Sequence, residues 1–539
     1  MEPLKNVTIG ELLDETVRKY GNQEAVIYSK EGIRLTYEEF ANEVNKLAKA
    51  LIGLGIQKGE HVAIWATNVP EWLLLQFATA KIGAVLVTVN TSYKARELEY
   101  LLKQSDTTTL FLIDGFKGTS YVKIVQSLMT SKENLPQLKN LIYIGDNTPN
   151  GMIQWDNLLE LASHITDEEL KQRESILSPN DVINMQYTSG TTGFPKGVML
   201  THYNIVNNGY LVAQAMKLTN KDRLCIPVPF FHCFGCVLGT LACVSVGATM
   251  VPIIEFNPEL VLETVEKEKC TGLHGVPTMF IAELNLPNFS KYDLSTLRTG
   301  IMAGSPCPIE VMKKVMDKMN LTEITIAYGQ TESSPVITQT TTSDPIERRV
   351  ETVGKPHPHV DVKIIDPNTG ETVGPNVQGE LCTRGYLVMR GYYKMPDATA
   401  EAIDAEGWLH TGDLATIDEE GYVKITGRLK DMIIRGGENV YPREIEECLY
   451  QHEAIIDVQV IGVPDEKYGE KVAACIKLKE GYKVTGEQLR EFCQDKLSYY
   501  KIPEYYFFVD EYPMTASGKI QKYKLREQAS EWLKEEVTK

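Results

Sequence analysis

The sequence predicts an α/β protein with more than one domain, and three observations support this fold class. Its 539 residues exceed what one hydrophobic core usually organises, and 43% of them are hydrophobic, which is enough to build several cores. From about residue 36 to 300, amphipathic helical segments alternate with short apolar runs rich in β-forming residues. After about residue 340 the pattern changes to short β-like runs separated by Gly, Pro and Asn turns.

The first part of the chain begins with an acidic amphipathic helix that we expect to be capped near Thr8. Helix–strand pairs follow at 38–54 with 61–66, 71–82 with 84–89, and 97–104 with 109–113. Such alternation is typical of a parallel sheet covered by helices, with ligands bound beyond the carboxyl ends of the strands.

The remaining segments predict two smaller units. Runs at 360–371 and 421–428 indicate a β subdomain over about 340–428. Beyond Lys430 we expect a compact α/β unit with a helix at 442–451, strands at 457–463 and 471–478, and a helix at 485–497. We place the domain boundary between Arg428 and Lys430, so that residues 1–429 form an N-terminal domain and residues 430–539 a C-terminal one.

Composition excludes several classes of protein. A net charge of −17 without a run of Lys or Arg argues against nucleic acid as a partner. Ten cysteines without framework spacing indicate reduced thiols and a cytoplasmic protein. The pair Cys233 and Cys236 has no second pair to complete a zinc site, so we interpret both as small core residues.

No export signal or transmembrane segment is expected. The N-terminus lacks the pattern of a signal or transit peptide. The most apolar window, 72–89, is interrupted by Gln76, Lys81 and Gly83, which suits a buried helix and strand better than a membrane span. Transient membrane contact to collect a substrate stays open, and the sequence carries no signal for an oligomeric state.

The segment from Tyr187 to His202, YTSGTTGFPKGVMLTH, predicts a phosphate-binding loop. Its glycines let backbone N–H groups turn toward an anion, its hydroxyls add short donors, and its lysine adds a positive charge. The residues concerned are Thr188, Ser189, Gly190, Thr191, Thr192, Gly193, Lys196 and Gly197. Pro195 before the lysine and Gly197 after it exclude a Walker A loop. A flexible linker is the alternative, but apolar runs on both sides predict strands that hold the loop at each end.

Four other polar clusters could carry chemistry, although each also has an ordinary structural explanation. YGQTE, 328–332, follows an apolar run, so Glu332 could hold Mg²⁺ and Thr331 could reach a phosphate, or the segment could be a simple turn. Asp413 in GWLHTGDL could accept hydrogen bonds from two ribose hydroxyls, or it could simply close a turn. Arg428 and Lys430 in GRLKD, and Lys519 in PMTASGKI, could be solvated surface charges.

Together these segments resemble one family, the adenylate-forming acyl-CoA synthetases of the AMP-binding superfamily, and most of all the medium-chain fatty acyl-CoA synthetases. The resemblance extends from about residue 8 to 527 and rests on seven motifs in the family's order: YTSGTTGFPKG, PFFHCFG, YGQTE, GYYKMPDATAEA, GWLHTGDL, GRLKDMIIRGGENVYPREIE and PMTASGKI. It implies a large N-terminal domain of two packed α/β sheets plus a small β-barrel, followed by a small mobile α+β C-terminal domain.

The resemblance also implies a reaction in two steps. A carboxylate attacks the α-phosphorus of ATP to give acyl-AMP and pyrophosphate, and the thiol of CoA then displaces AMP. Lys519 is implied as the catalytic cation, and Glu332 with Thr188 as the Mg²⁺ site. The loop from Thr188 to Lys196 is implied to hold the β- and γ-phosphates.

The nucleotide and CoA contacts follow from the same resemblance. Asp413 and Arg428 are implied to bind ribose, and the segments around Gly304, Ser305, Tyr328, Gly329 and Thr331 to hold adenine and phosphate. The sequence has MAGSP, 302–306, where much of the family has a Gly-Gly-Ala-type run, which leaves the contacts there less defined. Lys430 stands at the hinge position about which the C-terminal domain rotates, and Gly436 and Gly437 are implied to line the pantetheine channel.

The acid pocket is expected between the PFFHCFG segment and the strand ending in YGQTE. Its candidate residues are mostly apolar: His232, Phe234, Val237, Val276, Met302, Val336 and Ile337. This lining favours a fatty acid or a plain aryl acid over an amino acid, and the resemblance of RGGENVYPREIE to medium-chain and related fatty acyl-CoA synthetases implies a medium- to long-chain fatty acid. The alternatives are an aryl-CoA or other carboxylate-CoA ligase, a free-standing enzyme that loads a carrier protein, and a non-catalytic nucleotide-binding protein of the same fold.

Overall fold

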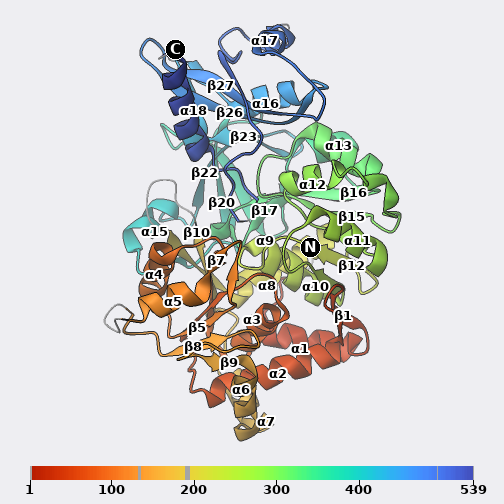
Figure 1. Ribbon diagram of the computed structural model, residues 1–539, viewed down its shortest axis with the longest axis vertical. Coiled ribbons are helices and arrows are strands. Elements are labelled where there is room, and N and C mark those ends of the chain that lie inside the picture. Colours follow the sequence, from red (N-terminus) through yellow and green to blue (C-terminus); the bar gives the residue numbers. More distant parts are fainter. Residues whose placement is uncertain are drawn as a thin grey trace.

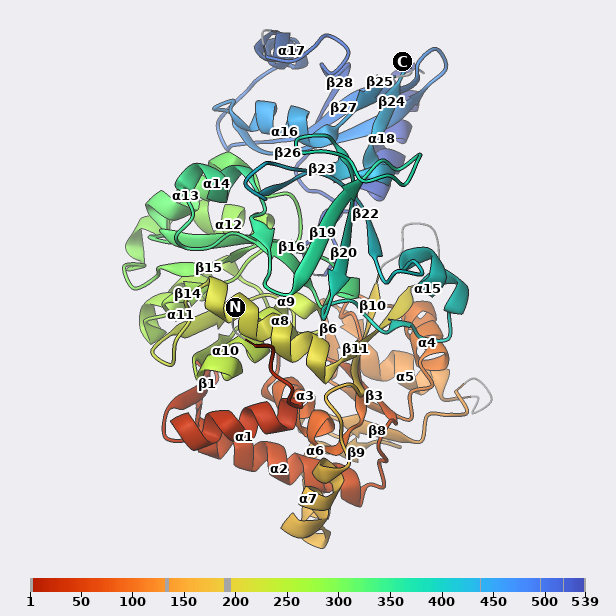
Figure 2. The same cartoon turned by 180° about the vertical axis from the view of Figure 1, so that it is seen from behind.

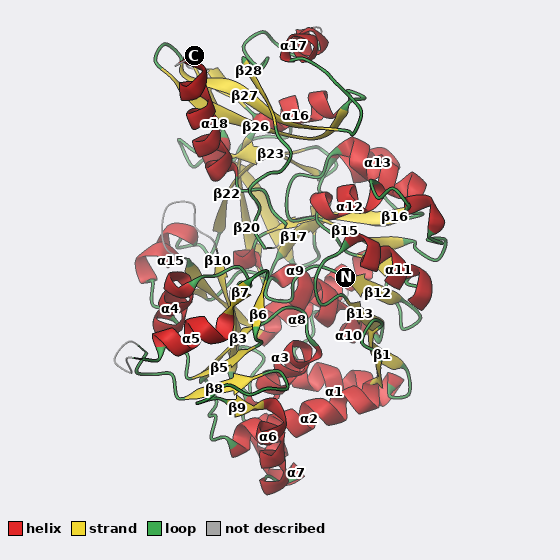
Figure 3. Ribbon diagram, in the orientation of Figure 1, coloured by secondary structure: helices red, strands yellow, loops and turns green. Residues whose placement is uncertain are grey.

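The computed structural model describes residues 3–130, 135–188, 195–436, 438–494, 496–516 and 518–537. Figure 1 and Figure 2 show a large lower part and a smaller C-terminal part, drawn in blue, that lies on top of it. Figure 3 shows the strands of the lower part flanked by helices. The predicted α/β class with a small C-terminal unit is confirmed.

The first sheet has eight strands in the order β21-β11-β10-β4-β3-β5-β8-β9. Their bounds are Gly391–Tyr392, Lys196–Thr201, Val182–Thr188, Val85–Thr88, His61–Trp65, Thr109–Leu112, Asn140–Tyr143 and Ile153–Gln154. The strands from β10 to β9 pair in parallel, and β11 pairs antiparallel on both sides. The helices that alternate in the chain with these strands are α2 (Tyr37–Gly53), α3 (Pro70–Ile82), α4 (Ala95–Gln104), α5 (Tyr121–Leu128), α6 (Trp155–Glu160) and α7 (Asp167–Ser175).

The second sheet has nine strands in the order β18-β17-β16-β15-β14-β12-β13-β1-β2. Their bounds are Lys355–Pro356, Val336–Gln339, Glu323–Gly329, Thr299–Met302, Gly272–Leu273, Arg223–Ile226, Thr249–Pro252, Glu24–Tyr28 and Ile33–Thr36. The associated helices are α1 (Ile9–Tyr20), α8 (His202–Ala215), α9 (Cys233–Gly235), α10 (Ala242–Val246), α11 (Pro258–Glu268), α12 (Pro277–Leu284), α13 (Ile309–Lys318) and α14 (Ile346–Glu351). Short turns of other helix types lie at η1 (Leu161–His164), η2 (Cys236–Leu241), η3 (Phe289–Lys291) and η4 (Thr331–Ser333).

The largest hydrophobic core joins these two halves of the lower part. Trp72 of α3 contacts Phe230, which follows β12, with ring centroids 5.3 Å apart. Phe40 of α2 packs edge-on against Phe77 of α3 at 5.4 Å. Because these large rings are fully buried, the two sheets are fixed relative to each other. The expected cap of α1 is confirmed, since Thr8 and Glu11 form a capping box.

The β subdomain is an antiparallel sheet in the order β19-β20-β22-β23. Its strands are Val360–Ile365, Gly379–Gly385, Leu409–Ile417 and Val423–Arg428, and α15 (Pro396–Ala402) lies between β21 and β22 in the chain. The expected barrel is therefore corrected to an open sheet, because four strands are too few to close around a filled interior. β6 (Gly115–Phe116) and β7 (Thr119–Ser120) form a separate ribbon.

The C-terminal part contains a five-stranded sheet, β25-β24-β27-β26 with β28 beside β27. The bounds are Glu438–Val440, Ile433–Arg435, Gly469–Leu478, Ile455–Asp465 and Tyr505–Phe508. Helices α16 (Pro442–Tyr450) and α17 (Gly486–Gln494) pack into one core on this sheet, and α18 (Lys522–Val537) packs into another. The turn η5 (Leu429–Asp431) connects β23 of the previous sheet to β24.

The cysteines all lie in the interior of the protein. All ten cysteines are buried and unpaired, including Cys233 and Cys236. None of the described helices combines the length and apolar character needed to cross a membrane.

Candidate active site

The predicted phosphate loop connects the two strands of a β-hairpin. Thr188 ends β10 and Lys196 begins β11, and these two residues pair across the hairpin. Ser189, Gly190, Thr191, Thr192 and Gly193 lie outside the described residues. Because β10 pairs in parallel with β4, the loop leaves the sheet at the carboxyl edge where ligands bind in such folds.

Lys196 and Glu332 meet through a tyrosine. The Lys196 Nζ lies 4.3 Å from the centre of the Tyr392 ring, a cation–π distance. The Tyr392 hydroxyl donates a 2.8 Å hydrogen bond to Glu332 Oε1. The structure therefore brings together a cation from the phosphate hairpin and the carboxylate predicted to hold Mg²⁺.

Glu332 belongs to η4, directly after strand β16. The turn is tight at Gly329, where a Cβ atom would lie only 1.8 Å from the carbonyl oxygen of Pro335. Thr331 is buried, and the Glu332 side chain is half-buried. A hard carboxylate oxygen beside a hydroxyl-rich hairpin fits the ligand preference of Mg²⁺, with Thr188 as the other predicted contact.

Asp413 forms the centre of a second polar group. Its Oδ2 accepts a 2.7 Å hydrogen bond from the Tyr328 hydroxyl, and its Oδ1 lies 3.3 Å from Arg428 Nε. Asp413 is 8% exposed, and burial raises the pKa of its carboxyl. The two residues predicted to bind ribose, Asp413 and Arg428, are therefore adjacent, and Tyr328 contacts Asp413 beside them.

Lys519 lies in a loop of the C-terminal part that reaches into the lower part. The Thr278 hydroxyl, on α12, donates a 3.0 Å hydrogen bond to the carbonyl oxygen of Gly518. A Cβ atom on Gly304 would lie 3.4 Å from Lys519 Cε. Lys519 thus stands beside the predicted Gly304–Ser305 segment.

The charge of Lys519 is strongly influenced by its surroundings. Its Nζ is 3.4 Å from His232 Nε2. Burial and the Arg428 guanidinium lower the pKa of Lys519 to about 8, although Glu332 and Asp413 act in the opposite direction. Burial and Lys519 likewise hold the pKa of His232 well below its usual range.

The predicted acid-pocket residues divide between two cores. Phe234, Val237, Val276 and Val336 are buried in the core between the sheets, and the Phe234 N–H donates a 3.2 Å hydrogen bond to His232 Nδ1. Met302 and Ile337 are buried in a different core. Successive residues of a strand point to opposite faces, so Val336 and Ile337 cannot both line one pocket. Met302 and Ile337 therefore stay pocket residues by sequence prediction alone.

The hinge and CoA predictions fall on the C-terminal part. Lys430 lies in η5, the short turn between the last strand of the β subdomain and the first strand of the C-terminal sheet. Gly436 is at the turn of the β24–β25 hairpin, and Gly437 lies outside the described residues. Figure 2 shows this hairpin near the C-terminus, at the top of the molecule, whereas α9 lies in the middle of the lower part. In this arrangement Lys519 contacts His232 of the lower part, whereas the β24–β25 hairpin lies in the C-terminal part at the top of Figure 2.

Two residues with site contacts were missed by the sequence reasoning. Tyr392 lies in GYYKMPDATAEA, one of the seven motifs that carry the resemblance, but no role was expected for this tyrosine. Thr278, which contacts the Lys519 loop, follows Pro277 at the start of α12 and carries no local signal.

The sequence matches two known family descriptions. The sequence model of "AMP-binding enzyme" matches residues 13–393, and that of "AMP-binding enzyme C-terminal domain" matches residues 444–519. "Putative acyl-CoA synthetase YngI" of Bacillus subtilis is 61% identical over 541 residues, which cover 98% of each chain. "Medium-chain acyl-CoA ligase ACSF2, mitochondrial" of Bos taurus is 42% identical, over 98% of this chain and 89% of its own.

A solved structure has the same fold over almost the whole length. The anthranilate CoA ligase AuaEII, in complex with anthranoyl-AMP, superposes with a TM-score of 0.85 at 28% identity, and the match covers 98% of both chains.

Proposed function

Because this chain belongs to the AMP-binding enzyme family, as an adenylate-forming acyl-CoA synthetase, we propose that it activates a medium- to long-chain fatty acid. The observation that carries the proposal is that four predicted pocket residues, Phe234, Val237, Val276 and Val336, are apolar and buried in one core, where Val276 lies next to Gly518, the neighbour of Lys519. Such a lining offers no cation to a second carboxylate of the substrate. The relative ACSF2, named a medium-chain ligase, supports the same substrate class.

In the first proposed step, a carboxylate oxygen of the acid forms a bond to the α-phosphorus of ATP. The bond from that phosphorus to the bridging oxygen breaks, and pyrophosphate leaves. Lys519 lies between the two anions and stabilises the charge on the phosphoryl oxygens. In the second step the sulfur of CoA attacks the acyl carbon, the bond to the phosphate oxygen breaks, and AMP leaves.

We assign the nucleotide contacts as follows. The hairpin from Thr188 to Lys196 holds the β- and γ-phosphates, and Asp413 with Arg428 holds the ribose. Gly304, Ser305, Tyr328, Gly329 and Thr331 surround the adenine and the α-phosphate. Glu332 and Thr188 would hold Mg²⁺, which neutralises phosphate charge when it is bound.

The two steps need different groups at the acyl carbon, so we propose that the C-terminal domain, residues 430–539, rotates about Lys430 between them. The present arrangement, with Lys519 at the site, corresponds to adenylate formation. Rotation would withdraw Lys519 and bring the turn at Gly436 and Gly437 toward the pantetheine of CoA. A narrow substrate passes close to backbone where side chains are absent.

An aryl acid is the second candidate, and the similarity to the anthranilate CoA ligase favours it. The deciding experiment measures pyrophosphate release and AMP release for straight-chain fatty acids of increasing length, aryl acids and amino acids, with and without CoA. We expect the highest kcat/KM with a fatty acid and CoA. A higher value for aryl acids would assign the second candidate. Adenylate formation without consumption of CoA would indicate carrier loading, and no turnover with any acid would indicate a non-catalytic binding protein.

A further inference from the structure

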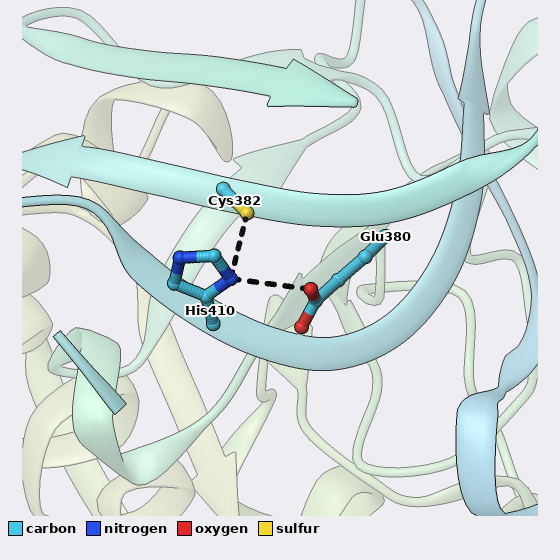
Figure 4. A group of neighbouring side chains, drawn as sticks. All are labelled: Glu380, Cys382 and His410. Atoms are coloured by element: carbon cyan, nitrogen blue, oxygen red, sulfur yellow. Dashed lines mark hydrogen bonds and ion pairs between the residues drawn. The ribbon is translucent and has the colours of Figure 1, made fainter. Parts of the chain in front are cut away.

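Beside the proposed ribose site, three polar side chains meet on the sheet of the β subdomain. Figure 4 shows Glu380 and Cys382 on β20 facing His410 on β22. His410 Nδ1 is 3.2 Å from Glu380 Oε2 and 3.5 Å from Cys382 Sγ. On the other side of the ring, His410 Nε2 is 3.5 Å from Asp404 Oδ2. Both ring nitrogens therefore face carboxylate oxygens.

The pairing of β22 with β20 is interrupted immediately after His410. Cys382 pairs with His410 and Glu380 pairs with Leu414, so one residue of β20 stands opposite 411–413 of β22. Such a bulge turns side chains out of the regular pleat and is frequent beside active sites. Here it contains Asp413, the proposed ribose ligand. At its centre, Gly412 has φ +70°, a left-handed conformation that favours glycine.

Side chains replace the strand pairing that the bulge has lost. Glu380 Oε1 accepts a 3.0 Å hydrogen bond from the Gly412 N–H. The Thr411 hydroxyl donates to the carbonyl oxygen of Leu381 at 2.7 Å and accepts from the Asp413 N–H at 3.2 Å. The backbone leading into Asp413 is thus held by the Glu380 carboxylate and by the Thr411 hydroxyl, which is itself bonded to Leu381.

We propose that Glu380 and His410 are positioning residues that fix Asp413 for binding of the nucleotide ribose. Glu380 holds the Gly412 N–H, His410 orients Glu380 through its second oxygen, and Asp404 orients the ring of His410. An outer partner of this kind restricts a binding group to one orientation without touching the ligand. The inference rests on the proposed ribose role of Asp413.

The same three side chains also form a sulfur, nitrogen and oxygen donor set of the kind that binds Zn²⁺. Two observations favour the positioning role. Both oxygens of Glu380 already accept hydrogen bonds from the protein. Burial raises the pKa of the Cys382 thiol to about 12, so that the thiolate needed by a metal is disfavoured at neutral pH.

The test measures AMP binding to the full-length enzyme by calorimetry. Glu380→Ala should weaken AMP binding by about tenfold, the effect of losing a hydrogen bond to a charged group. The matched control is Asp361→Ala, which removes an exposed carboxylate of the same sheet that pairs with Arg384, and it should leave the affinity unchanged. Glu380→Gln keeps one oxygen acceptor and should lose about threefold; it carries the test if the alanine variant does not fold.

A double-mutant cycle separates positioning from general destabilisation. If Glu380 acts through Asp413, the Glu380 substitution should change AMP affinity by less than about twofold when Asp413→Ala is already present. An equal loss in both backgrounds would overturn the proposal. So would one equivalent of Zn²⁺ retained by the wild type after dialysis and lost in Cys382→Ser, which would assign a metal site instead. Failure of the wild type itself to bind AMP would contradict the proposed nucleotide site. Equal AMP affinities of the wild type and Glu380→Ala would contradict only the positioning role of Glu380.

Discussion

The residues proposed to bind ribose and the lysine proposed to drive adenylate formation are held in different ways. Asp413 lies on a strand between β20 and β23, and its carboxylate contacts Tyr328 at 2.7 Å and Arg428 at 3.3 Å. Lys519 lies in a loop, and its contacts with the lower part include a 3.0 Å bond from Thr278 to Gly518 and the 3.4 Å approach to His232.

The difference concerns which groups can move during the reaction. A group in a sheet moves only if a ladder of hydrogen bonds breaks, whereas a docked loop is released by breaking single contacts that each contribute about 1 kcal/mol. Further hydrogen bonds that the described residues form between the parts include single ones from the Ile309 N–H to Glu447 and from Arg443 to the carbonyl oxygen of Ile425. The contrast supports a fixed nucleotide site and a removable catalytic cation.

The largest effect is expected for Lys519→Ala. Adenylate formation should fall by about a thousandfold, because a preorganised charge on the transferred phosphoryl group is lost. Thioester formation from supplied acyl-AMP should be largely retained. Single-turnover assays of the two half-reactions measure this, with Lys524→Ala, an exposed lysine of α18, as the control. Equal loss of both half-reactions would contradict the proposed role of Lys519.

A stiffened hinge should have the opposite selectivity. Lys430→Pro restricts the backbone in η5 and should slow thioester formation by about a hundredfold while adenylate formation continues. Lys430→Ala removes the same side chain without restricting the backbone, so most of the activity should return. If the alanine and proline variants lose the same half-reaction equally, the side chain is what matters and hinge rotation at this residue is wrong.

The pH dependence of adenylate formation should show that Lys519 has a lower pKa in the ligand-free enzyme than in the enzyme with bound substrates. The pKa of Lys519 is lowered to about 8 in the ligand-free enzyme, so the side chain is charged below this pH and neutral above it. The value of kcat/KM for ATP in adenylate formation should therefore fall by about tenfold per pH unit above that pKa. Bound phosphates favour the ammonium, so the corresponding fall in kcat should occur at higher pH. A flat kcat/KM profile would contradict the proposal that the ammonium form is required.

The smallest effect is expected where the loop docks. Thr278→Val removes the hydroxyl that bonds the carbonyl oxygen of Gly518 but keeps the shape of the side chain. Adenylate formation should slow by about threefold because one neutral hydrogen bond is lost. Thr278→Ser keeps the hydroxyl and serves as the control, and the rate of thioester formation should not fall in either variant. An effect of Thr278→Val as large as that of Lys519→Ala would show that the loop is not lightly docked.

Much of the fold could be predicted because its elements have local signals. Helix–strand alternation predicted β3, β4 and β5 of the first sheet, and apolar flanks predicted that the phosphate loop joins two strands. Motif positions also indicated Asp413 and Arg428, which the structure places together.

The parts that the sequence could not predict depend on long-range geometry. The contact between Tyr392 and Glu332 depends on the pairing of β21 with β11, two strands whose residues lie almost 200 positions apart in the sequence. The assignment of Met302 and Ile337 to the pocket required knowing which face of each strand meets the site. The expected barrel required knowing how many strands the subdomain holds.

The burial of every cysteine has a practical consequence. Cys448, Cys475 and Cys493 belong to the C-terminal sheet and its helices, and the others belong to the lower part. A buried thiol reacts with an alkylating reagent only after the structure around it opens. The native thiols therefore report the local unfolding of each part separately. Alkylation followed by peptide mass mapping can show which part of the enzyme opens first, and no cysteine has to be introduced by mutation.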